Sequence, residues 1–199
     1  RENKVMSLKT RFGNLGNILD FNNLTQENIY VLDSPILSNS QLEKFTNFVD
    51  KNTITIDCTF GKNVNLESAI EKIKKDSEIA VRQGATQLIL SDKNISESRL
   101  PIPMLLCVGA INTYLIKMKL RGYASINAQT GEALDTHSFA TLIGVGATTV
   151  NPYLALDSLY QRFEKKLFGK FGYDECIERY VKSVNYGLLK IMSKMGISV

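Results

Sequence analysis

The sequence contains few of the residues that build metal centres and disulfide frameworks. Its 199 residues include three cysteines and a single histidine, His137. A metal site needs three or four converging ligands, and these residues are too few and too scattered to give a recognisable ligand spacing. We therefore predict no metal site. We expect Cys58, Cys107 and Cys176 to be reduced core thiols of an intracellular protein, cytoplasmic or organellar and not secreted.

Long hydrophobic runs and a strong charge of one sign are missing as well. The longest apolar stretch, residues 102–116, is interrupted by Pro103 and Gly109, so it falls short of the roughly 20 residues of a membrane span. No signal peptide opens the chain. The 24 Lys and Arg exceed the 20 Asp and Glu by only four and are dispersed, whereas binding to phosphates needs cations gathered on one face. We expect neither a membrane nor a nucleic acid as a partner.

The rest of the composition is that of a globular domain. The chain is 44% hydrophobic and 22% charged, and a chain of this length removes roughly 70% of its unfolded surface from water on folding. Repeats and linker-like stretches are missing, so we predict a single domain over residues 1–199, with a turn-rich lead-in over 1–28 and a terminal helix within 174–199. The first residue is not methionine and the chain stops abruptly, which we interpret as a piece cut from a longer protein.

Short β-branched runs alternate with longer segments of helical periodicity. The predicted strands are residues 29–32, 53–56, 87–90, 124–128 and 148–150; the predicted helices are 40–49, 66–83, 103–119, 135–143, 154–165 and 174–195. For the helix over 66–83, Asn65 is a suitable N-cap and Gly84 a suitable left-handed terminator. Strict strand–helix succession makes right-handed parallel crossovers the default, so we predict an α/β fold with a parallel sheet of about five strands.

Polar residues follow the predicted strands, at Asp33-Ser34, Asp57, Ser91-Asp92, Gln129-Thr130 and Asn151. The carboxyl edge of a parallel sheet is where ligands bind, so a functional rim would lie there. Taken singly, each of these residues is more typical of a helix cap or a turn.

The candidate catalytic motifs are incomplete. His137 lies near Asp135, with Ser138 or Ser91 as conceivable nucleophiles, but no nucleophile-elbow sequence presents either serine. The stretch Gly144-Val145-Gly146 follows a predicted helix and precedes a strand, the reverse of a dinucleotide-binding loop, so it indicates a helix end. We therefore predict no catalytic residue and no cofactor-binding residue in this chain.

An ordered set of short motifs nevertheless resembles the central domain of glutamate synthases over nearly the whole chain. The matching stretches include Arg1-Glu2, Val5-Met6-Ser7-Leu8, Asn17-Ile18-Leu19, Asp33-Ser34-Pro35-Ile36-Leu37-Ser38-Asn39, Ile56-Asp57, Thr59-Phe60, Ile89-Leu90-Ser91-Asp92, Ile102-Pro103, Leu105-Leu106, Val108-Gly109-Ala110, Thr130-Gly131-Glu132, His137, Phe139-Ala140, Leu142-Ile143-Gly144, Gly146-Ala147, Asn151-Pro152-Tyr153-Leu154-Ala155, Gly187-Leu188-Leu189-Lys190 and Met192-Ser193-Lys194-Met195-Gly196-Ile197-Ser198. The sequence departs from the family pattern in three places. Ser91-Asp92-Lys93 stands for Ser-Asp-Arg, Asn112-Thr113-Tyr114 stands for a histidine cluster, and Ser138 stands for the second histidine of His-His-Phe.

The resemblance implies a domain without chemistry of its own and an incomplete (β/α)-barrel-like topology. The parent enzyme of the family transfers the amide nitrogen of glutamine to 2-oxoglutarate. Its amidotransferase domain releases ammonia, and its FMN-binding domain, which also carries a 3Fe-4S cluster, reduces the imine. The resemblance implies that the central domain links these two domains of the same chain, helps to wall the ammonia tunnel, and leads through residues 174–199 toward the FMN domain.

Residues 35–39 are the candidate tunnel or interdomain segment. A channel for neutral ammonia must exclude bulk water, and Pro35, Ile36, Leu37, Ser38 and Asn39 combine apolar side chains with hydroxyl and amide groups. The alternative interpretation is a strand-to-helix turn in which Ser38 or Asn39 caps the following helix. Two other functions stay open: a free-standing barrel-like enzyme that binds a phosphate or flavin at the strand ends, and a regulatory protein-interaction module.

Overall fold

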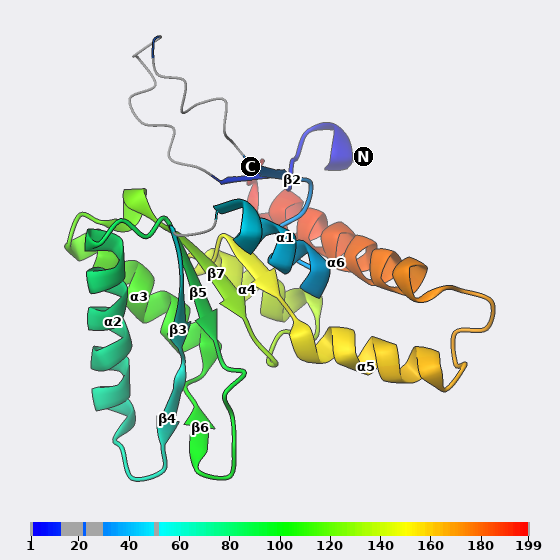
Figure 1. The fold of residues 1–199 in the computed structure, drawn as a ribbon. Coiled ribbons are helices and arrows are strands. Elements are labelled where there is room, and N and C mark those ends of the chain that lie inside the picture. The colour runs from blue at the N-terminus through cyan, green and yellow to red at the C-terminus, as the bar shows by residue number, and fades with distance from the viewer. Residues whose placement is uncertain (1, 13–21, 23–29, 50–51, 199) are drawn as a thin grey trace.

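The computed structural model describes residues 2–12, 22, 30–49 and 52–198 (Figure 1). Most of the predicted lead-in over 1–28 lies outside these residues. Its described part holds a short 3-10 helix, η1 (Glu2–Lys4), and a strand, β1 (Thr10–Phe12).

A parallel sheet of four strands forms the centre of the described structure. The strands are β3 (Thr53–Asp57), β5 (Gln87–Ser91), β7 (Ser125–Gln129) and β8 (Thr149–Asn151), and they lie side by side in chain order. All three pairings are parallel. In the described residues the sheet stays open and alternates with helices, which confirms the predicted α/β class and the incomplete barrel-like topology.

The predicted strand over 29–32 forms, but its membership in the parallel sheet is wrong. Strand β2 (Tyr30–Leu32) pairs antiparallel with β1 in a separate two-stranded sheet. The reason is packing, because Phe12 of β1 packs against Phe45 of α1 with ring centroids 4.5 Å apart and the rings tilted by 52°. Ile36 occupies the place beside β8 instead, through an isolated parallel bridge to Val150.

The predicted helices all form, with ends shifted by a few residues. They are α1 (Asn39–Val49), α2 (Leu66–Arg82), α3 (Met104–Lys117), α4 (Thr136–Gly144), α5 (Tyr153–Glu164) and α6 (Tyr173–Met195). As predicted, the Asn65 side chain accepts a hydrogen bond from the Glu67 N–H (2.7 Å), and Gly84 takes a positive φ of 98°. None of the described helices combines the length and the apolar character needed to cross a membrane.

The two faces of the sheet differ in chemistry. One face carries Ile56, Leu88, Leu90, Ile126, Ala128 and Val150, which form the main core with residues of α2, α3, α4 and α6. Because side chains alternate along a strand, the other face carries Gln87, Ile89, Ser91, Asn127, Gln129, Thr149 and Asn151. Ile89 there packs with Leu37 and with Leu42 and Phe45 of α1. The second face is therefore mostly polar although it is largely buried.

Helices α5 and α6 extend away from the sheet as a pair joined by a loop (Figure 1). Helix α6 returns along α4, and the closest approach is at Gly187, where an added Cβ would lie 2.6 Å from Thr136 Cγ2. Near its end the Ser198 carbonyl accepts a hydrogen bond from the Ser7 N–H (2.9 Å), which ties the two ends of the described chain together. A further antiparallel pair, β4 (Thr59–Gly61) with β6 (Arg99–Pro101), projects beyond the carboxyl edge of the sheet.

Candidate functional site

The last residue of each parallel strand is polar, and the four lie at one level of the sheet. Asp57 pairs in register with Ser91, Ser91 with Gln129, and Gln129 with Asn151. We call these four residues the terminal polar layer. In barrel enzymes this level carries the reacting groups. The hydrogen bonding of these four side chains therefore decides whether the predicted rim can bind a ligand.

Three members of the terminal polar layer are hydrogen-bonded to one another. The Ser91 hydroxyl donates to Gln129 Oε1 (2.8 Å), and Gln129 Nε2 donates to Asn151 Oδ1 (3.3 Å). Asn151 Nδ2 then donates to the Leu37 carbonyl (2.9 Å) and to Asn39 Oδ1 (3.0 Å). Ser91 and Gln129 therefore bind along the sheet edge, and Asn151 binds the protein's own 35–39 segment.

The fourth member, Asp57, is held by the projecting β4–β6 pair. Its carboxylate accepts hydrogen bonds from the Thr59 hydroxyl (2.7 Å) and from Arg99 Nη2 (2.9 Å). Burial by itself raises the pKa of Asp57, but the hydrogen bonds from Thr59 and Asn94 and the charge of Arg99 together leave that pKa below its ordinary value. The carboxylate is therefore ionised at neutral pH and acts as an anchor for β6.

A second carboxylate, Asp92, joins the loops that follow three strands. It is 1% exposed and accepts hydrogen bonds from the Thr130 hydroxyl (2.5 Å) and the Gly131 N–H (3.2 Å). The Tyr153 hydroxyl also bonds to it, and burial together with this bond raises the pKa of Tyr153. Lys93, at the position of the family's arginine, lies with Nζ 5.2 Å from the centroid of the Tyr153 ring. Asp92 thus connects the start of α5 to the loops after β5 and β7.

The 35–39 segment lies against β8 and turns into α1. Leu37 N–H donates to the Val150 carbonyl (2.9 Å), and Val150 N–H donates to the Pro35 carbonyl (2.8 Å). Pro35, Ile36 and Leu37 are buried, whereas Ser38 is partly exposed and Asn39 is exposed. The part of the segment that reaches the surface is therefore polar.

Ser38 is the cap of α1, which confirms the alternative interpretation for that residue. Its hydroxyl accepts from the Gln41 N–H (3.2 Å), and its own N–H donates to Gln41 Oε1 (2.9 Å). This reciprocal pair is a capping box.

The remaining motifs have local structural roles. Asp135 caps α4 by accepting from the Ser138 N–H (2.8 Å) and the Ser138 hydroxyl (2.7 Å), bonds that lower the pKa of Asp135, while His137 is exposed. Gly146, with φ of 123°, follows the end of α4 as predicted.

A hydrogen bond with Cys107 and burial raise the pKa of Cys58, so its thiolate is disfavoured. Within the described ranges no three His, Cys, Asp or Glu side chains converge as metal ligands.

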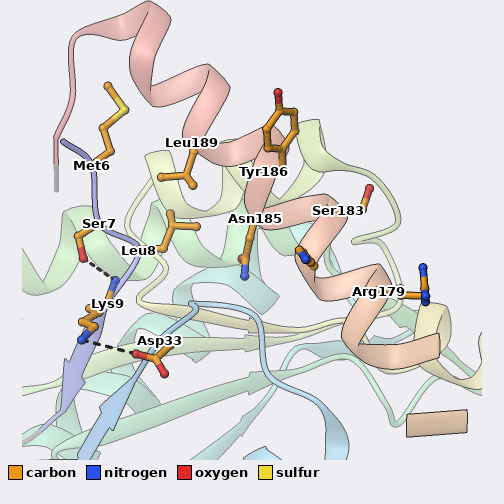
Figure 2. Close-up of a pocket in the computed structure, with 11 residues that line it drawn as sticks. Met6, Ser7, Leu8, Lys9, Asp33, Arg179, Ser183, Asn185, Tyr186 and Leu189 are labelled. Carbon is orange, nitrogen blue, oxygen red and sulfur yellow. Dashed lines mark hydrogen bonds and ion pairs between the residues drawn. The ribbon is translucent and has the colours of Figure 1, made fainter. Parts of the chain in front are cut away.

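A groove of about 770 Å³ lies between the residues that precede β1 and helix α6. Figure 2 shows Lys9 reaching toward Asp33 (3.8 Å) on one side, with Arg179, Asn185 and Tyr186 of α6 on the other. The sequence did not predict this groove because its walls come from opposite ends of the chain. Arg99, Tyr153 and Asn39 were also missed as partners of the strand-end carboxylates and amides, since they lie at distant positions in the sequence.

Comparisons with known proteins assign the sequence to one group. The family model for the glutamate synthase central domain matches residues 1–199. The glutamate synthase [NADPH] large chain of Azospirillum brasilense is 46% identical over 202 residues, and that of Bacillus subtilis is 38% identical over 202 residues. The chloroplastic ferredoxin-dependent glutamate synthase of Spinacia oleracea is 37% identical over 214 residues. All three alignments cover 100% of this chain, but the chain spans only 13% of each relative.

A solved structure with a related fold is a flavocytochrome b2 variant with benzoylformate. Its TM-score is 0.51 with 14% sequence identity, over 80% of this chain and 35% of that chain. At this identity the likeness concerns the fold alone.

Proposed function

The chain belongs to the family of glutamate synthase central domains, and on this basis we propose that it is a non-catalytic domain joining the glutamine amidotransferase domain to the FMN and 3Fe-4S domain of one large chain. The relatives are far longer than this chain, which leaves room for both domains on the same polypeptide. The observation that carries the non-catalytic role is the terminal polar layer. Its side chains bind one another, the 35–39 segment and the β4–β6 pair.

The chemistry of the strand ends does not fit a flavin phosphate. A phosphate needs free backbone N–H groups or cations. Here Asp57 and Asp92 place carboxylates at the ends of β3 and β5, and the Gly131 N–H already donates to Asp92. The Arg99 cation is already paired with Asp57, and the buried Asp92 carboxylate would repel a phosphate, so we propose that the FMN of the parent enzyme binds to another domain.

Titration of the chain with FMN, followed by flavin fluorescence, tests this part of the proposal. We expect no saturable binding at micromolar flavin. Saturable micromolar binding would favour the alternative of a flavin-binding barrel-like enzyme.

The 35–39 segment is the part of this domain that we propose as tunnel wall. Neutral ammonia is retained best by a wall that excludes bulk water and offers few charges. The segment presents Ser38 and Asn39 at the surface over buried Pro35, Ile36 and Leu37, and both polar side chains are fixed by hydrogen bonds. A polar, uncharged and rigid surface of this kind suits the passage of ammonia between two active sites.

Matched cap substitutions in the full-length large chain test the wall. Ser38→Asp keeps a good N-cap but adds a negative charge to the segment, and Asn65→Asp makes the same change at the cap of α2. We expect Ser38→Asp alone to lower the ratio of glutamate formed to glutamine hydrolysed and to release ammonia into solution. An unchanged ratio in both variants would refute the wall assignment.

A further inference from the structure

The 35–39 segment continues the parallel sheet beyond β8 for only one step. The ladder consists of the Val150 N–H donating to the Pro35 carbonyl (2.8 Å) and the Leu37 N–H donating to the Val150 carbonyl (2.9 Å). In a parallel ladder the next bond would run from the N–H of residue 152 to the Leu37 carbonyl. Residue 152 is proline, which has no N–H. The backbone of β8 therefore has no donor for that carbonyl.

The Asn151 side chain supplies the missing donor. Its Nδ2 lies 2.9 Å from the Leu37 carbonyl oxygen and 3.0 Å from Asn39 Oδ1. Asn151 is 1% exposed and Leu37 is fully buried. Without this bond the Leu37 carbonyl would be buried, and the backbone of β8 would offer it no other hydrogen-bond donor. One carboxamide thus binds the segment at two points, at Leu37 and at the first residue of α1.

The other end of this carboxamide is hydrogen-bonded to side chains of two neighbouring strands. Asn151 Oδ1 accepts from Gln129 Nε2 (3.3 Å), and Gln129 Oε1 accepts from the Ser91 hydroxyl (2.8 Å). Donors and acceptors therefore run in one direction, from β5 through β7 and β8 to the segment. The Leu37 carbonyl can only accept a hydrogen bond, so it fixes the Asn151 amide with Nδ2 toward the segment, whereas the Ser91 hydroxyl can donate or accept and imposes no direction.

We propose that Asn151 is a positioning residue: its side-chain amide binds the 35–39 segment in place of the backbone N–H that Pro152 lacks, and Gln129 is hydrogen-bonded to its other end. An effect of Asn151 on ammonia transfer rests on the proposed wall function of the segment. An effect of Asn151 on the backbone of the segment does not rest on that function, so ammonia transfer and backbone stability can be measured separately.

Asn127 offers a matched control. It is also a buried asparagine of the polar face, 2% exposed, and lies on the neighbouring strand β7. Its side chain accepts from the Thr149 hydroxyl (2.6 Å) and donates to Gln87 Oε1 (3.1 Å). These partners lie within the sheet, away from the 35–39 segment. Asn127→Ala and Asn151→Ala therefore both remove a buried carboxamide, and only the second removes the bond to Leu37.

The test is hydrogen exchange of both variants in the full-length large chain, read by mass spectrometry on peptides covering residues 36–42. Loss of one buried hydrogen bond predicts about a tenfold faster exchange of this segment in Asn151→Ala and no segment-specific change in Asn127→Ala. Adding Pro152→Ala to Asn151→Ala restores a backbone N–H at residue 152 and should return exchange toward the original rate. Equal segment exchange in the two single variants, or a double variant as fast as Asn151→Ala, would overturn the proposal.

The ratio of glutamate formed to glutamine hydrolysed separates positioning from the wall function. Faster segment exchange with a lowered ratio supports both. Faster exchange with an unchanged ratio supports positioning and overturns the wall function. If Asn151→Ala does not fold, Asn39→Ala removes one of the two bonds from an exposed position. It should speed exchange by about threefold, and an unchanged rate would overturn the proposal.

Discussion

Replacement of Gly187 by alanine tests how tightly α6 is docked on α4. The new Cβ would lie 2.6 Å from Thr136 Cγ2, 2.7 Å from Thr136 Oγ1 and 3.1 Å from Thr136 Cβ. Rotation of the Thr136 side chain moves its terminal atoms but not its Cβ, so the helices themselves must separate slightly. Overpacking of this kind costs about 1–3 kcal/mol.

Gly109, in the interior of α3, provides the matched control. An added Cβ at Gly109 has no heavy atom within 4 Å. Glycine-to-alanine changes inside a helix gain about 1 kcal/mol from backbone propensity, and this gain applies at both positions. Gly109→Ala should therefore stabilise the chain by about 1 kcal/mol. Gly187→Ala should be less stable than Gly109→Ala by the overpacking cost of about 1–3 kcal/mol.

Urea unfolding followed by far-ultraviolet circular dichroism measures this difference. For a domain of this size, 1 kcal/mol shifts Tm by about 2–4 °C, so thermal unfolding resolves it independently. Equal stabilisation by the two substitutions would refute the close approach of α6 to Thr136, and with it the packing that we derive for the end of the chain.

Three further outcomes concern helix caps and titrating groups. Ser38→Ala should lower the free energy of unfolding by about 1 kcal/mol. Adding Gln41→Ala should lower it by less than Gln41→Ala does alone, because the two side chains share one capping box; equal effects of Gln41→Ala in both backgrounds, measured by urea unfolding, would contradict this. The folded-state pKa of Asp135 is lowered, so the stabilisation by this carboxylate is fully present above the ordinary pKa of aspartate and is lost as pH falls through the folded-state pKa. Asp135→Asn should therefore make the free energy of unfolding depend less on pH in the acid range, and an unchanged dependence would argue against the cap. Burial raises the pKa of Tyr180 to about 12, so stability should fall as pH rises from about 10 toward that value, and Tyr180→Phe should weaken this loss in alkaline unfolding curves.

The regular elements were predictable because their periodicity is local. Residues 66–83 carry apolar side chains on one helical face, and the observed α2 ends one residue earlier. Strands β3, β5, β7 and β8 overlap the predicted runs because buried parallel strands are short and β-branched or apolar. The family resemblance was likewise carried by short motifs in chain order, and the family model covers the same residues.

The antiparallel pairs were not predictable in the same way. Strands β1, β4 and β6 have three residues each, too few to show a two-residue alternation. Their existence depends on partners far along the chain, such as Arg99, which holds Asp57 and Thr59 across about 40 residues. The same holds for β2, whose assignment to the parallel sheet failed because Phe12 and Phe45 draw it into another packing unit.

The polar residues at the strand ends show most clearly what the sequence determines and what only the tertiary structure decides. Which residue types stand at the ends of the strands is written in the order of the chain: Asp57, Ser91, Gln129 and Asn151 each follow a run of strand formers, and Pro152 removes a donor whatever its surroundings. Whether those polar groups face a ligand or one another was decided only in three dimensions. Parallel registration brings them to one level, and the 35–39 segment arrives there from more than 100 residues away to accept the Asn151 amide. Local sequence sets a backbone's conformational preferences, whereas the partner of a buried hydrogen-bonding group depends on the packing of the whole chain.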